Sequence, residues 1–122
     1  MKLRIKGNSL RLRLTKSEVS KLAREGIVEE HIGFVNNELT YSIESSKTAH
    51  TITASFQGNA IRVIMPSLLS EDWPTNDIIS FDEYLDENDQ QSLYILIEKD
   101  FKCIDATTED QSDNFENPAK SC

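Results

Sequence analysis

Residues 1–13 constrain the fold most, because apolar and basic side chains alternate on both sides of a Gly-Asn dipeptide. Alternation with a period of two is typical of a β-strand with one apolar and one polar face. Gly-Asn favours a two-residue turn, which fixes the register of a hairpin. The predicted pairs are Lys6 with Ser9, Ile5 with Leu10, Arg4 with Arg11, Leu3 with Leu12, and Lys2 with Arg13.

This hairpin has one strongly cationic face, which calls for a counter-charge. Like charges directly opposite each other, such as Arg4 and Arg11, destabilise a hairpin by about 0.2–1 kcal/mol per pair. We therefore expect an anion over this face: the chain's own acidic segment, an acidic partner protein, or nucleic acid. The candidate binding residues are Lys2, Arg4, Arg11 and Arg13.

Charge is distributed unevenly along the 122 residues. Residues 1–25 carry eight Lys or Arg and two acids, and the remainder carries five and nineteen, so a segment of charge +6 precedes one of −14. Length and composition predict one globular α+β domain over residues 1–104. Residues 105–122 hold few large apolar groups and are predicted to form an acidic, loosely ordered tail. Its candidate counter-charges are Glu109, Asp110, Asp113 and Glu116.

The rest of the chain predicts short strands and one clear helix. Thr15 and Glu18 form a capping box before residues 16–25, where the apolar spacing is helical, and Gly26 supplies a left-handed stop. Asn36-Asn37 and Gly58-Asn59 each predict a further two-residue hairpin turn. Together about eight short strands and one amphipathic helix indicate a curled antiparallel sheet or a partly open β-barrel.

The first residues, the apolar runs and the cysteine spacing all favour a soluble cytoplasmic protein with no membrane segment. The first residues alternate charge with apolar side chains, whereas a secretory signal has an unbroken apolar stretch. No run approaches the roughly 20 apolar residues of a membrane span. Cys103 and Cys122 lie far apart and do not show the cysteine spacing of a disulfide-rich protein, so we expect reduced thiols.

Motifs for catalysis or metal binding are weak. Residues 110–121 lack the Gly and the terminal Glu of a calcium loop, and a zinc site needs several closely spaced Cys or His. Cys103 follows an apolar strand, and His31 and His50 lie on separate predicted strands. We expect no metal or cofactor, and we expect a binding or accessory protein more than an enzyme. The alternative is a metal- or thiol-dependent enzyme centred on Cys103 and the tail carboxylates.

Nucleic-acid binding through the basic hairpin is a second alternative. Four basic side chains in a row can meet successive phosphates. Against it, no aromatic residue alternates with these basic residues in the sequence, and the rest of the molecule repels a polyanion. Trp73, next to Pro74, is either a binding anchor or, more simply, part of the core.

Two sequence segments resemble a family of small uncharacterised bacterial proteins, described as a domain of unknown function. They are residues 1–9, MKLRIKGNS, and residues 98–118, which include Glu98-Lys99-Asp100-Phe101, Cys103 and Asn117-Pro118. The resemblance spans most of the chain and implies a bacterial, cytoplasmic protein, with no activity, ligand or catalytic residue attached.

These observations predict a small accessory protein that binds through its cationic hairpin face. The ligand is an acidic protein partner or, at rest, the protein's own tail. A tethered tail competes at high effective concentration until a stronger anion displaces it. Removing residues 106–122 is then expected to strengthen binding of an anionic ligand at low salt.

Overall fold

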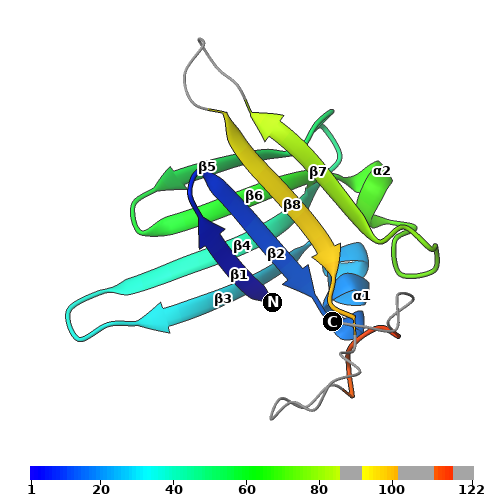
Figure 1. Ribbon diagram of the computed structural model, residues 1–122, viewed down its shortest axis with the longest axis horizontal. Coiled ribbons are helices and arrows are strands. Elements are labelled where there is room, and N and C mark those ends of the chain that lie inside the picture. The colour runs from blue at the N-terminus through cyan, green and yellow to red at the C-terminus, as the bar shows by residue number, and fades with distance from the viewer. Residues whose placement is uncertain (86–91, 102–111, 117–122) are drawn as a thin grey trace.

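The computed structural model describes residues 1–85, 92–101 and 112–116 of the chain. Two helices and eight strands follow one another along these residues (Figure 1). In chain order they are β1 (Lys2–Lys6), β2 (Ser9–Leu14), α1 (Lys16–Glu25), β3 (Ile27–Gly33), β4 (Glu38–Ser46), β5 (Thr53–Gln57), β6 (Ala60–Pro66), α2 (Ser67–Ser70), β7 (Ser80–Leu85) and β8 (Leu93–Lys99).

The strands form two four-stranded sheets built on one plan. Sheet A has the order β1-β2-β8-β7, and sheet B has the order β3-β4-β6-β5. Each sheet contains two antiparallel hairpins whose second strands pair in parallel, β2 with β8 and β4 with β6. Sheet A therefore joins the first hairpin of the chain to the last, and it brings residues 9–14 beside residues 94–99.

The predicted fold class is confirmed in outline and corrected in detail. Eight short strands are present, and a curled sheet describes them roughly. Within the described residues no barrel closes, two central pairs are parallel, and α2 is a second, short helix. Local turn chemistry specifies a hairpin, and this could be predicted from the sequence pattern. Which hairpins pair with each other depends on the burial of apolar faces in the whole fold, and this could not.

The predicted register of the first hairpin is confirmed for all five pairs. Gly7 has a φ of 55° and Gly58 a φ of 52°, the left-handed backbone that these turns require and that glycine adopts without strain. A hairpin does form around Asn36-Asn37, but its predicted turn length and register were wrong. Ile32 pairs with Leu39, so the loop covers residues 34–37 and is two residues longer than predicted.

Helix α1 has the predicted bounds, Lys16–Glu25. The Glu18 amide donates to the Thr15 hydroxyl, and the Thr15 amide donates to the Glu18 carboxylate at 2.9 Å. Gly26, with a φ of 83°, ends the helix by donating its amide to the Leu22 carbonyl. Both capping interactions satisfy backbone groups that a helix end leaves without partners.

The core lies between the two sheets, and α1 packs against β2, β3, β4 and α2. Trp73 is fully buried with its ring edge against Phe81, and its indole N–H donates to the Ile78 carbonyl at 2.7 Å. It is therefore a core residue and no exposed anchor. The largest fully buried side chains are Trp73, Leu12, Leu14, Leu22, Ile43, Met65, Ile95 and Ile97.

Candidate anion-binding face

The basic side chains of the first hairpin share the outer face of sheet A. Strand β2 alternates strictly: Leu10, Leu12 and Leu14 are buried in the core, and the residues between them are partly exposed. The confirmed register puts the basic residues of β1 opposite the outward residues of β2. We call this set the basic face; it consists of Lys2, Arg4, Lys6, Arg11 and Arg13.

Strand β8 supplies a counter-charge that lies 80 residues or more from the hairpin in sequence. Parallel pairing puts Glu98 beside Arg13. One carboxylate oxygen of Glu98 accepts from Nε of Arg11 at 2.5 Å and from Nε of Arg13 at 2.7 Å. The Glu98 side chain is only 12% exposed beneath the two guanidinium groups. One negative charge thus neutralises one of two positive charges.

A second carboxylate contacts the basic face at the same end, where Lys2 pairs with Arg13. Nζ of Lys2 lies 3.4 Å from a carboxylate oxygen of Asp100, which is almost fully buried. Arg4 and Lys6 are exposed and form no ion pair with any residue in the described part of the chain. The basic face therefore keeps an excess of positive charge, concentrated at the β1 edge.

The start of β1 is held in place by a buried amine. The N-terminal ammonium of Met1 binds the carboxylates of Glu18 and Glu30, the latter at 2.9 Å, and the hydroxyl of Tyr41 donates to the Met1 carbonyl. Burial lowers the pKa of this amine, but the hydrogen bonds and charges of the two carboxylates outweigh burial and leave the pKa raised. These contacts fix the edge strand that carries Lys2 and Arg4.

Aromatic side chains also lie on this face, contrary to the sequence-based expectation. Tyr94 of β8 pairs with Ser9 and with Tyr84 of β7, so both tyrosines point outward beside the basic face. Their ring centroids are 4.7 Å apart, and Tyr84 is 67% exposed. The Tyr94 hydroxyl donates to Asp82 at 2.9 Å, and this hydrogen bond raises its pKa.

A shallow groove of about 260 Å³ joins the cations to Tyr94. It runs along the outer surface of β1, β2 and β8. Its lining residues are Arg4, Lys6, Ser9, Leu10, Arg11, Tyr94 and Leu96. Across sheet A the outward side chains therefore change from basic on β1 and β2, through tyrosine and leucine on β8, to tyrosine and the acidic Asp82 on β7.

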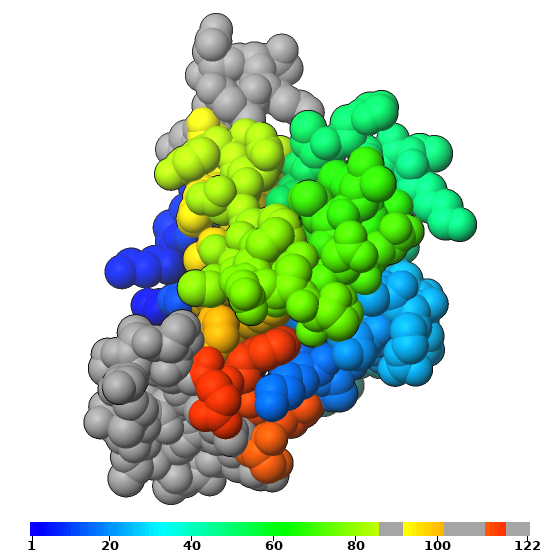
Figure 2. Space-filling view, turned by 90° about the vertical axis from the view of Figure 1, so that its right-hand side faces the viewer, coloured from blue at the N-terminus to red at the C-terminus, as the bar shows by residue number. Residues whose placement is uncertain are grey.

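The described part of the predicted tail lies at the start of α1. Figure 2 shows residues 112–116, in orange-red, beside the blue start of the helix. The Asp113 carbonyl accepts from the Lys16 amide at 3.0 Å, and its carboxylate accepts from the Ser17 hydroxyl at 2.6 Å. Glu116 lines a cleft nearby. Glu109 and Asp110 lie outside the described residues.

The two histidines considered for catalysis have different surroundings. His31 is half exposed and contacts Thr40, Glu29 and Glu38, all on its own hairpin. His50 lines a shallow pocket together with Glu83 of β7. Among the described residues no three His, Cys, Asp or Glu side chains are placed to hold a metal ion. Cys103 lies outside the described residues.

Comparison with known proteins identifies a family. The model of a family of unknown function, DUF7009, matches residues 1–119. The chain belongs to this family. The match covers both segments that carried the resemblance seen in the sequence, and the DUF7009 chain contains the basic hairpin and the acidic C-terminal segment together.

Neither a search of curated proteins nor a search of solved structures returned a match to this DUF7009 chain. In the described part of the chain, no helix has the length and apolar character needed to cross a membrane.

Proposed function

We propose that this protein is a small, non-enzymatic binding protein whose basic face engages an acidic segment of a partner protein. The observation that supports this most is the imbalance of charge on the basic face. Glu98 and Asp100 contact three of its cations, whereas Arg4 and Lys6 extend from the edge strand with no ion pair to a described residue.

An acidic protein segment suits this surface better than a continuous polyanion. The basic face contacts Glu98, Asp82 lies one strand further across the same face of sheet A, and the chain carries a net charge of −8. Such a mixture repels an unbroken row of phosphates but accepts carboxylates spaced along a peptide. Tyr84 and Tyr94 next to the cations are the observation that favours the second candidate, single-stranded nucleic acid, because bases stack on aromatic rings.

The first test measures binding of a fluorescein-labelled polyglutamate peptide by fluorescence anisotropy at low and high salt. We expect saturable binding that weakens as salt rises. The double variant Arg4→Ser/Lys6→Ser should bind about 2- to 30-fold more weakly, since an exposed ion pair contributes about 0.2–1 kcal/mol. The matched control Lys21→Ser/Arg24→Ser removes the same charge from exposed positions on α1 and should bind nearly as wild type.

Three results of this titration are decisive. Equal loss of affinity in both double variants would mean that net charge alone matters and would contradict the proposal. Absence of binding at low salt would leave the cations of β1 with only the role of preventing edge-to-edge aggregation of sheet A. Tighter, stacking-dependent binding of a single-stranded oligonucleotide, lost on Tyr84→Ser, would support the nucleic-acid candidate instead.

The same assay addresses competition by the tail. We propose that the acids at 109 and 110 compete for the basic face while Asp113 keeps its contacts at α1. Glu109→Gln/Asp110→Asn should then bind the peptide more tightly than wild type at low salt, and the gain should shrink as salt rises. Unchanged affinity would exclude competition by these residues.

A further inference from the structure

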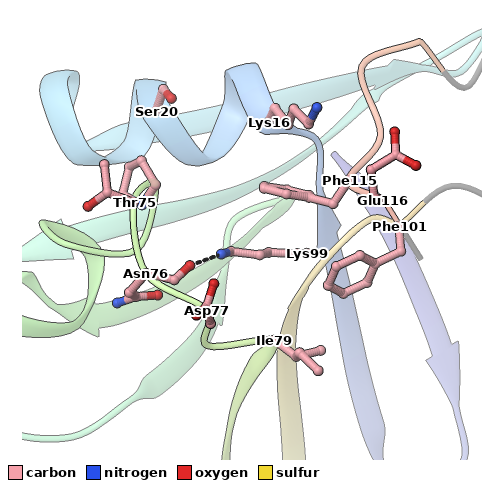
Figure 3. A pocket seen from close by; sticks show the side chains of 11 residues that line it. Lys16, Ser20, Thr75, Asn76, Asp77, Ile79, Lys99, Phe101, Phe115 and Glu116 are labelled. Carbon is pink, nitrogen blue, oxygen red and sulfur yellow. Dashed lines mark hydrogen bonds between the residues drawn. The ribbon is translucent and has the colours of Figure 1, made fainter. Parts of the chain in front are cut away.

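A buried lysine lies at the bottom of a second, separate cleft. Lys99, the last residue of β8, is 5% exposed, and its side chain is directed to the core side of sheet A, following Ile95 and Ile97. The cleft beside it has a volume of about 660 Å³, within the range of ordinary small-molecule sites. It opens between the start of α1, residues 74–79, and residues 115 and 116 (Figure 3).

The ammonium group of Lys99 is only partly satisfied. Nζ donates to the Asn76 carbonyl at 2.7 Å and lies 4.9 Å from the Phe115 ring centre and 5.9 Å from the Trp73 ring centre. It forms no ion pair with any residue that the structure describes. Burial lowers its pKa, and the charge of Asp77 only partly opposes this. An ammonium has three N–H donors, and the Asn76 carbonyl accepts from one of them.

The walls of the cleft combine apolar surface with a charged rim. Phe101 and Phe115 stand with ring centroids 5.7 Å apart, and Pro74 and Ile79 add aliphatic surface. Lys16 and Glu116 lie at the rim, where Figure 3 shows Lys16 above Phe115, and Asp77 lines the cleft next to Asn76. A site with a cation at the bottom and apolar walls is complementary to a small molecule that has an oxyanion at one end and an apolar body at the other.

We propose that this cleft binds a small organic oxyanion, a carboxylate or phosphate attached to an aromatic or similarly apolar group, with Lys99 as the direct anion ligand and Phe115 as the apolar contact. The purely structural alternative is that Lys99 only anchors the Asn76 loop. The two accounts differ in one respect: only the first requires that a negatively charged ligand bind better than its neutral isostere.

Trp73 makes the test direct, because it is the one tryptophan of the chain and its ring lies next to the Lys99 ammonium. Tryptophan fluorescence is recorded while phenylacetate, phenyl phosphate or the neutral phenylacetamide is added to the full chain. We expect a saturable change with at least one oxyanion and at least about tenfold weaker binding of phenylacetamide, because a hydrogen bond to a charged group is worth about 1.5–3 kcal/mol. The ratio of the affinities for phenylacetate and phenyl phosphate shows whether the cleft prefers a carboxylate or a phosphate.

Variants locate the site. Lys99→Met should bind the preferred oxyanion at least about tenfold more weakly, whereas the control Lys21→Met, at an exposed position on α1, should bind as wild type. Equal affinity of Lys99→Met and wild type would overturn the proposal, as would equal binding of phenylacetamide or no saturation by either oxyanion at millimolar concentration.

A measurement on the wild-type protein covers the case in which Lys99→Met does not fold. Acetylation of individual lysines by acetic anhydride is followed by mass spectrometry with and without the preferred oxyanion. Protection of Lys99 relative to Lys21 is expected, and equal acetylation rates in both conditions would overturn the proposal. Binding at the basic face is independent of this cleft, so Arg4→Ser/Lys6→Ser should leave the fluorescence titration unchanged.

Discussion

At the scale of single residues, Glu98 determines how much charge the basic face presents. Its carboxylate is shared by Arg11 and Arg13 and is largely shielded from solvent. A shared carboxylate removes the repulsion between two neighbouring guanidinium groups and occupies donors that an external acid would otherwise use. Glu98 is therefore a structural residue of sheet A and, under the proposed function, also competes with the ligand for Arg11 and Arg13.

Replacing Glu98 by glutamine should separate these two roles. Glu98→Gln is expected to lower the free energy of unfolding by about 1–3 kcal/mol, because a neutral amide oxygen replaces the charged acceptor of two guanidinium groups. It should also increase affinity for the polyglutamate peptide at low salt, since Arg11 and Arg13 become available. Urea unfolding and anisotropy measure the two effects on the same protein.

Glu44→Gln on sheet B is the matched control for this change. Glu44 accepts two hydrogen bonds from Arg62, at 2.7 and 3.1 Å, so the substitution removes the same charge from a carboxylate that also accepts two hydrogen bonds, away from the basic face. Its affinity for the peptide should remain close to that of wild type. A comparable gain in Glu44→Gln would assign the effect to net charge.

Some residues of the outer face of sheet A could be assigned to it from the sequence, and others could not. The basic residues of the first hairpin could be placed on one face because their spacing and turn are local. Glu98, Tyr84 and Tyr94 could not be assigned to that face, since they reach it only through the parallel pairing of β2 with β8. The signal that could have found them is the strand phase of β8, in which Tyr94 and Glu98 alternate with Ile95 and Ile97.

At the scale of elements, helix α1 shows both what was predictable and what was not. Thr15, Glu18 and Gly26 identified both ends of the helix correctly. The remaining donors of the first turn find acceptors on Asp113: its carbonyl accepts from the Lys16 amide, and its carboxylate from the amide and hydroxyl of Ser17. An acceptor this distant in sequence has no local signal.

The Asp113 contact predicts a pH dependence of stability. The hydrogen bond from the Ser17 hydroxyl is the largest cause of the lowered pKa of Asp113. Because the folded-state pKa is below that of the unfolded chain, about 3.9, the stabilisation is complete above that pH and is lost as pH falls through the folded-state value. Asp113→Asn should therefore lower the unfolding temperature at neutral pH, and the difference from wild type should shrink below about pH 4.

Thermal unfolding followed by circular dichroism between neutral pH and pH 3 measures this difference, with Glu71→Gln as a control at an exposed position. The control should track wild type at every pH. A difference between Asp113→Asn and wild type that stays constant over the whole range would show that the ionised carboxylate contributes nothing beyond its hydrogen-bonding geometry.

At the scale of the whole molecule, the two sheets repeat one plan, and both proposed binding sites involve sheet A. Three of the four hairpins, β1–β2, β3–β4 and β5–β6, were predictable from a turn dipeptide and alternating side chains, apart from the longer loop at residues 34–37. The β7–β8 hairpin was not predicted from a turn dipeptide. The parallel pairing of the second strands, β2 with β8 and β4 with β6, was not predictable, because it depends on burying two apolar faces against each other. That pairing puts the first and last hairpins in sheet A, and thereby the basic face beside β8 and the Lys99 cleft at the end of the same strand.

Amide chemical-shift mapping by NMR, during titration of the full chain with the polyglutamate peptide, shows directly whether the basic face is the binding surface. We expect the shifts to concentrate on β1, β2 and the outward positions Tyr94 and Leu96 of β8, and to fade as salt is added. Shifts confined to sheet B or to the surface of α1, with β1 and β2 unaffected, would show that the basic face does not bind the peptide.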